Sequence, residues 1–252
     1  MKKTAIFFVI CIACFLFMSC SNSNVSETAA AAKMEGDGYA SAEKAAEAYL
    51  QAFKAANLSG MLSAFALETY VDNYDLEAQL ARLKAYSLSS DPSLPASNDF
   101  TRDLNFHQRT GNVTAAIRFQ YLTIFTSDLK ALDGITMSLT SDDDISRLAM
   151  QLGNPAYLES LQGMELGEFL PPENLNEHYL SEQNRLNMQK IASICGADEM
   201  KSVAVPATID EQEYLFCFDA VRYGSQWYLS SLSGNIGALL NIPTFSGGVF
   251  LR

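Results

Sequence analysis

The sequence has few of the residues on which catalytic and metal sites depend. Only two of its 252 residues are histidines, His107 and His178, and five are cysteines. No segment has the spacing of a nucleophilic serine elbow, a phosphate-binding loop, a cysteine-rich zinc site or a dinucleotide-binding loop. We therefore expect no metal site and no cofactor, and these absences weigh against an enzyme.

Positive charge is also scarce. The chain has 17 Lys and Arg residues against 29 Asp and Glu residues, which gives a formal net charge of -12 at pH 7. An acidic surface repels phosphate backbones, so nucleic acid is not expected as a partner, and tight binding to anionic lipid head groups is disfavoured. The simplest interpretation of the acidity is solubility.

Long apolar runs are missing as well. The run at residues 5–18 is shorter than the roughly 20 residues that a membrane-spanning helix needs. It follows two lysines and precedes Ser19 and Cys20, an order typical of a secretory signal peptide. The small residue directly before Cys20 resembles the site read by lipoprotein signal peptidase, although Phe17 stands where Leu is usual.

This resemblance implies a lipoprotein precursor that is cut before Cys20 and anchored by lipid on that cysteine to the outer face of the cell membrane. Residues 1–19 would be the signal peptide and residues 20–39, small and polar, a flexible tether. An uncleaved N-terminal anchor is the alternative, and both place the domain outside the cytoplasm. Cleavage at Cys14 is disfavoured because it would leave apolar residues 15–18 exposed.

Cleavage would leave Cys195 and Cys217 as the only cysteines besides the lipid-bearing Cys20. In an oxidising compartment these two could form a disulfide, and the alternative is two buried free thiols. The sequence does not fix the distance between them, so both alternatives stay open.

The first folded segment is predicted to be helical. Ser41 can cap a helix over residues 42–56, in which apolar residues recur at three- and four-residue steps. Asn57 begins a second helix that runs to about Leu67, and a third helix is expected near residues 75–86.

The period then changes to two, which favours β-strands. Residues 103–109 and 113–126 alternate in polarity on either side of Gly111-Asn112, a turn sequence, so a β-hairpin is expected there. At the other end, residues 203–209 and the apolar run 214–223 are predicted strands.

The chain is expected to close with a second hairpin and a short helix. Gly224-Ser225 is predicted to turn the apolar strand into residues 226–232, and residues 234–240 can form the closing helix. Between the two predicted strand regions, about residues 138–196, we expect a helical insertion. Within it the acidic triplet Asp142-Asp143-Asp144 lacks the ligand pattern of a calcium loop and is predicted to begin a solvated helix.

Two segments resemble the NTF2-like (cystatin-like α+β) superfamily. Residues 41–65 are similar to its opening pair of helices, and the hairpin Tyr223-Gly224-Ser225-Gln226-Trp227-Tyr228-Leu229 is similar to its closing hairpin. Uncharacterised lipoproteins of Gram-positive bacteria look alike at both places. The resemblance implies an α+β fold over residues 40–252, in which N-terminal helices pack on a strongly curved antiparallel sheet. It says little about function, because this fold hosts enzymes, binding proteins and assembly domains.

Four aromatic residues and one acid form the candidate pocket. Phe119, Tyr121, Phe216 and Trp227 could line an apolar cavity, although by default such residues form the core beneath a curved sheet. Asp219 lies within an apolar run, where burial would raise its pKa and make it a candidate general base. We favour the alternative, a carboxylate at the sheet edge that is paired with Arg118 or Arg222 or hydrated.

Three functions are consistent with these observations. Our main prediction is a membrane-tethered, non-catalytic domain that binds a small ligand or an envelope protein. A homodimeric envelope assembly protein that self-associates through its sheet is the second. An extracytoplasmic enzyme using Asp219 is the third, and the lack of catalytic motifs weighs against it.

Overall fold

The computed structural model describes residues 33–88, 90–126 and 138–252. Met34–Arg252 form one compact unit. The predicted signal peptide, Cys20 and most of the predicted tether lie outside the described residues. No helix in the described part of the chain is long and apolar enough to cross a membrane.

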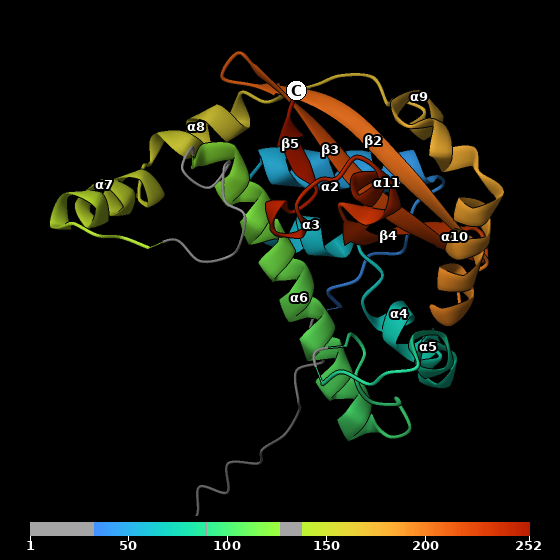
Figure 1. Ribbon diagram of the computed structural model, residues 1–252. Helices are drawn as coiled ribbons and strands as arrows, with labels where there is room; N and C mark the ends of the chain where they lie inside the picture. The colour runs from blue at the N-terminus through green and yellow to red at the C-terminus, as the bar shows by residue number, and fades with distance from the viewer. Residues whose placement is uncertain (1–32, 89, 127–137) are drawn as a thin grey trace, which may run out of the picture. The chain divides into compact units, whose positions relative to one another are not determined.

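The described unit combines many short helices with one antiparallel sheet (Figure 1). In chain order its elements are α2 (Ala42–Lys54), α3 (Leu58–Ser63), α4 (Glu68–Asn73), α5 (Leu76–Leu83), α6 (Asp99–Phe125), α7 (Asp142–Leu152), α8 (Ala156–Gln162), β1 (Glu165–Leu166), α9 (Pro172–Leu175), the 3-10 helix η2 (Glu177–Leu180), α10 (Glu182–Ile194), β2 (Glu199–Ile209), β3 (Gln212–Tyr223), β4 (Gln226–Leu232), α11 (Gly234–Leu239), the 3-10 helix η3 (Thr244–Ser246) and β5 (Val249–Leu251).

Strand β3 is the centre of the sheet. The strand order is β1-β2-β3-β4, and β5 pairs with β3 beside Tyr214 to Phe216, whereas β4 pairs with it from Phe218 onward. Every residue from Tyr214 to Val221 is buried, so the predicted central strand with both faces covered is confirmed. The tight hairpin at Gly224 and the short closing helix are confirmed as well.

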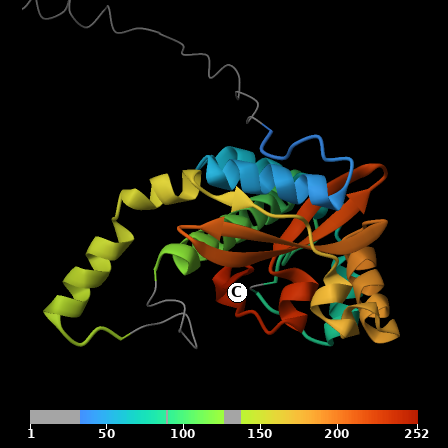
Figure 2. The same ribbon diagram turned by 90° about the horizontal axis from the view of Figure 1, so that it is seen from above.

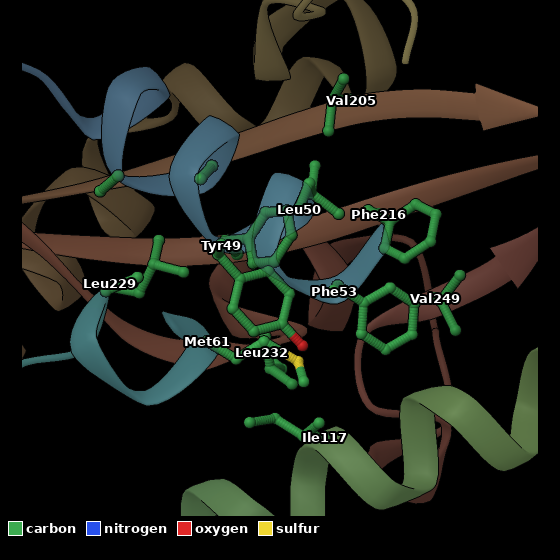
Figure 3. Packing of buried hydrophobic residues seen from close by; sticks show 14 of the residues in the cluster. Tyr49, Leu50, Phe53, Met61, Ile117, Val205, Phe216, Leu229, Leu232 and Val249 are labelled. Carbon is green, nitrogen blue, oxygen red and sulfur yellow. The ribbon is translucent and has the colours of Figure 1, made fainter. Parts of the chain in front are cut away.

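Helix α2 covers one face of the sheet, as the opening segment predicts. Ser41 caps it by accepting a hydrogen bond from the backbone N–H of Lys44 at 3.2 Å. Tyr49 and Phe53 point toward β3, where the Phe53 ring meets that of Phe216 edge-on at 6.2 Å (Figure 3). The α+β arrangement of N-terminal helices on a curved antiparallel sheet is therefore confirmed.

Helices α10 and α11 and the 3-10 helix η2 cover the opposite face (Figure 2). There Cys217 packs with Leu215 and Ile236 in a second, smaller core cluster. The sheet is thus the middle of three layers, and a β-strand buried on both faces explains why residues 214–221 are almost continuously apolar.

The predicted hairpin at residues 103–126 is wrong, because this segment is one helix. Helix α6 runs for 27 residues from Asp99, and Asn98 caps it by accepting from the backbone N–H of Thr101. Its inward side carries polar residues beside apolar ones: Asn105, Arg109, Val113, Ile117, Gln120 and Ile124 are the buried positions. They are three or four residues apart, which is helical spacing.

Arg109 is the most unusual of these inward residues, because arginine is rarely buried. Its side chain is 9% exposed and its guanidinium donates to the carbonyls of Ser230 (2.5 Å) and Ala66 (3.4 Å). It also pairs with Asp91 at 3.4 Å and lies 4.0 Å from the ring centre of Tyr70. One side chain therefore links α6 to β4, to α4 and the residue Ala66 before it, and to the segment that follows α5.

A second polar link lies beneath α2. The Tyr49 hydroxyl donates to Gln120 Oε1 at 2.6 Å, and Gln120 Nε2 donates to the carbonyl of Gly247 at 2.8 Å. Gly247 has a φ of 64°, and an added Cβ would come within 2.4 Å of the Gln120 backbone, so only glycine fits there.

We expect Tyr49→Phe to lower the free energy of unfolding by about 1–3 kcal/mol, because Gln120 Oε1 would stay buried without a donor. Urea denaturation measures this change. Tyr157→Phe is the control, since Tyr157 stacks on Phe125 at 4.8 Å in a half-exposed position and the change should stay within about 0.5 kcal/mol. Equal effects of the two variants would contradict a structural role for the Tyr49 hydroxyl.

Two features differ in detail from the prediction: the mainly helical segment 138–196 and the residue at which the folded unit begins. Residues 138–196 are mainly helical, but they include the edge strand β1, which pairs with Ala207 and Thr208 of β2. The compact unit begins at Met34, earlier than the predicted boundary at residue 40. Glu35 is 3% exposed and accepts hydrogen bonds from the backbone N–H groups of Leu67 (2.5 Å) and Thr69 (3.0 Å).

Candidate functional site

Asp219 lies in the middle of the molecule, with both carboxylate oxygens hydrogen-bonded. The Ser202 hydroxyl donates to Oδ1 at 2.7 Å, and the backbone N–H of Asn235 donates to Oδ2 at 2.8 Å. Burial raises its pKa to about 6, although the hydrogen bonds from Ser202 and Asn235 favour the charged form and oppose the shift. Asp219 is 3% exposed, and its hydrogen-bond partners are Ser202 and Asn235 and neither Arg118 nor Arg222.

The position of Asp219 indicates a structural role. Its two hydrogen bonds join β3 to β2 and to the first turn of α11. Gly234 precedes this turn with a φ of 58°, and a Cβ there would lie 2.3 Å from the Asp219 carboxyl carbon. The chain therefore approaches the carboxylate so closely that no substrate group can reach it from this side.

The predicted pocket is not formed, because none of the cavities in the described part of the chain is lined by more than one of its five residues. Phe216 belongs to the core under α2, whereas Asp219 lies on the face of β3 that α11 covers. Phe119 and Tyr121 are on helix α6 and not on a strand, and Trp227 of β4 pairs through its backbone with Tyr39. Because side chains alternate along a strand, positions 216 and 219 of β3 face opposite ways.

The two remaining cysteines are buried free thiols and not a disulfide. Cys217 packs with Leu215 and Ile236, whereas Cys195 packs in a different cluster with Tyr70. Burial raises the pKa of the Cys217 thiol to about 12 and raises that of Cys195 as well. A thiol attacks as the thiolate, so neither cysteine is suited to nucleophilic chemistry at neutral pH.

Neither histidine takes part in a cluster of catalytic or metal-binding groups. His107 and His178 are both exposed, on α6 and η2. In residues 33–88, 90–126 and 138–252 no three His, Cys, Asp or Glu side chains converge in a way that could hold a metal ion.

A groove between α10 and the first half of β2 has a volume of about 620 Å³. We call it the α10–β2 groove. Its buried floor includes Met188 and Ala192 of α10, and Leu180 of η2, 69% exposed, stands at its edge. The full lining consists of Tyr179, Leu180, Arg185, Met188, Gln189, Ala192, Ser193, Ala197, Asp198, Glu199, Met200 and Lys201.

Most charges of the groove already have partners. Lys201 forms an ion pair with Glu43 of α2. Asp198 and Glu199 both face Arg222, at 3.7 and 3.2 Å. Arg185 is the exception: it is exposed and forms no ion pair within the described ranges. The groove therefore combines an apolar floor with one cation that is available to an anionic group.

The sequence did not predict this groove, because its lining comes from η2, α10 and β2. The spacing of Met188 and Ala192, four residues apart, marks an inward face of a helix but not the strand that it meets. The contact between Tyr179 and β2 also joins residues far apart in the sequence: the Tyr179 hydroxyl accepts a hydrogen bond from the backbone N–H of Ser202 at 3.1 Å.

Comparison with known proteins gives little further guidance. No protein-family model matches the chain, and no curated protein matches it. A solved structure, described as a cystatin-like protein from Ruminococcus gnavus ATCC 29149, is similar at a TM-score of 0.48 with 17% sequence identity. The similarity covers 83% of this chain and 44% of that one, so this chain spans less than half the length of that protein.

Proposed function

We propose that the protein is a lipid-anchored, extracytoplasmic and non-catalytic domain that binds a small amphipathic ligand in the α10–β2 groove. The observation that carries the proposal is the groove itself. Its volume of about 620 Å³ lies within the roughly 300–1,000 Å³ typical of small-molecule sites, and its lining is mixed apolar and polar. The proposed location, anchored by lipid outside the cytoplasm, rests on the resemblance of the segment before Cys20 to a lipoprotein processing site.

The lining indicates the class of ligand. Met188 and Met200 offer flexible, polarizable side chains that adapt to apolar groups of irregular shape. Arg185 at the mouth favours a carboxylate or phosphate, which its planar guanidinium can bind through two hydrogen bonds. A molecule with an apolar body and a single anionic group fits both features.

The alternatives of sheet-mediated assembly and of catalysis by Asp219 find less support. Helices cover both faces of the sheet, so a dimer through a sheet face would have to displace a packed layer. Asp219 does not line the α10–β2 groove, and both of its oxygens are occupied.

Native mass spectrometry of the chain from Ser21 onward, incubated with an envelope extract and purified gently, tests the proposal. We expect a retained small molecule of constant added mass. Gln189→Trp, which narrows the groove from α10, should lower the fraction of the protein that carries this added mass. Gln183→Trp is the matched control, since Gln183 is exposed on the same helix but does not line the groove.

Two outcomes would count against the proposal. A bare mass for the unaltered protein at saturating extract concentration would show that the groove retains nothing. An added mass that Gln189→Trp and Gln183→Trp retain to the same extent would place the ligand elsewhere.

A further inference from the structure

Helix α7 is amphipathic, yet none of its residues is buried. Ile145, Leu148 and Leu152 recur at three- and four-residue steps and form one apolar face, with Ile145 and Leu152 50% and 46% exposed. In both views the helix extends away from the sheet beyond α8 (Figures 1 and 2). An 11-residue helix in which no residue is buried is only marginally stable in water, so a partner surface would stabilise it.

We call α7 the arm. An apolar groove of about 260 Å³ lies beside α8, the helix that follows the arm. We call it the α6–α8 groove, because Ile117 and Tyr121 of α6 and Leu158 and Leu161 of α8 form much of it. All of its lining residues are apolar except Thr114 and Arg118. Leu158 and, on the α3 side, Leu58 are 48% and 44% exposed, so the groove presents uncovered apolar surface.

The two surfaces are also complementary in charge. Asp142 and Asp143 begin α7 and form no ion pair in the part of the chain that the structure describes, whereas Asp144 pairs with Arg147. Arg118, the one charged residue of the α6–α8 groove, likewise has no carboxylate partner there and lies over the Phe119 ring. The acidic start of one α7 and the Arg118 of another chain would attract each other.

We propose that two copies of this chain form a dimer by exchanging arms, so that α7 of each copy lies in the α6–α8 groove of the other. Arm and groove are neighbours, since only residues 153–155 separate α7 from α8. A two-fold arrangement therefore buries both apolar faces at once and pairs both acidic helix starts with Arg118.

A second copy suits the arm better than a membrane does. The apolar face of α7 could also lie on lipid, but three aspartates begin the helix. Anionic head groups would repel these aspartates, whereas the α6–α8 groove offers apolar surface together with a cation.

Sedimentation equilibrium of the chain from Ser21 onward tests the dimer. Leu148→Glu in the arm and Leu58→Glu in the groove should each raise the dimer dissociation constant at least about 30-fold, the effect of losing a central interface residue. Ser146→Glu, off the apolar face of α7, and Leu83→Glu, at a leucine of similar exposure on α5, are the matched controls and should leave it unchanged. Arg118→Glu should weaken the dimer, and Asp142→Arg in the same chain should restore it.

A mixture of the Leu148→Glu and Leu58→Glu variants distinguishes arm exchange from other dimers. Each mixed pair keeps one intact arm in one intact groove, so the mixture should associate more tightly than either variant alone. A monomer at all concentrations, a dimer unaffected by both variants, or a mixture no tighter than its components would overturn the proposal. Flotation of a monomeric protein with neutral phosphatidylcholine vesicles would overturn it in favour of lipid.

Discussion

Replacing Arg109 by leucine should lower the free energy of unfolding by about 3–5 kcal/mol, the range for breaking a buried charge pair from one side. Arg109 is the side chain that joins α6 to the carbonyls of Ala66 and Ser230 and to the Asp91 carboxylate. Without it these acceptors lose their donor, and one Asp91 oxygen already lies buried without a partner in the described structure. Leucine also removes the contact of the guanidinium with the Tyr70 ring.

Arg102→Leu is the control for this experiment, because Arg102 lies on the same helix and is also paired with acids. Its side chain and those of Glu68 and Asp72 are each at least one-third exposed, so water screens the pairs and the loss should be about 0–1 kcal/mol. Urea denaturation at pH 7 measures both variants. Similar losses for the two would mean that burial does not determine the contribution of Arg109.

Buried polar residues such as Arg109 explain why the sequence pattern of α6 predicted a hairpin. The buried side of α6 is polar at Asn105, Arg109 and Gln120, so the apolar period of a buried helix is interrupted. Residues 113–125 happen to alternate in polarity, and Gly111-Asn112 has the composition of a turn. Asn98, which caps the helix, is a local sign of a helix start. The hydrogen bonds that satisfy the buried polar groups involve segments far away in the sequence, such as Gly247 for Gln120.

Local signals predicted other elements correctly. Ser41 with the apolar spacing of α2 is sufficient to define a capped helix, and Gly224 with a φ of 60° fits a tight hairpin turn. Candidate sites depend on which elements meet, and the sequence does not encode this locally. The α10–β2 groove exists because α10 crosses the first half of β2, and Phe216 and Asp219 separate because β3 is buried on both faces.

Asp219 should make the stability of the protein depend on pH. Its pKa is raised from the ordinary value of 3.8 to about 6, so ionising it is harder in the folded protein than in the unfolded chain. Below pH 3.8 the carboxyl is neutral in both states and its contribution is complete. As the pH rises through about 6 the contribution is lost, and the whole loss is about 3 kcal/mol.

Asp219→Asn isolates this effect, because an amide resembles the neutral acid. Its oxygen can accept from the Asn235 N–H, and its nitrogen can donate to the Ser202 hydroxyl oxygen. In urea denaturation at several pH values, the variant should match the unaltered protein near pH 4. At pH 7.5 it should be more stable by about 3 kcal/mol, the energy that corresponds to the raised pKa.

Glu43→Gln provides a control of opposite sign. Burial is the largest single influence and raises the pKa of Glu43, but the hydrogen bonds from Lys201, from its own backbone N–H and from Ser41, together with the charge of Lys201, outweigh it and the net shift is downward. The Glu43 contribution is therefore present at neutral pH and lost on acidification, so Glu43→Gln should lose stability relative to the unaltered protein as the pH rises from 3 to 6. If Asp219→Asn shows no dependence on pH while Glu43→Gln does, hydration of Asp219 or stronger hydrogen bonds must offset the burial.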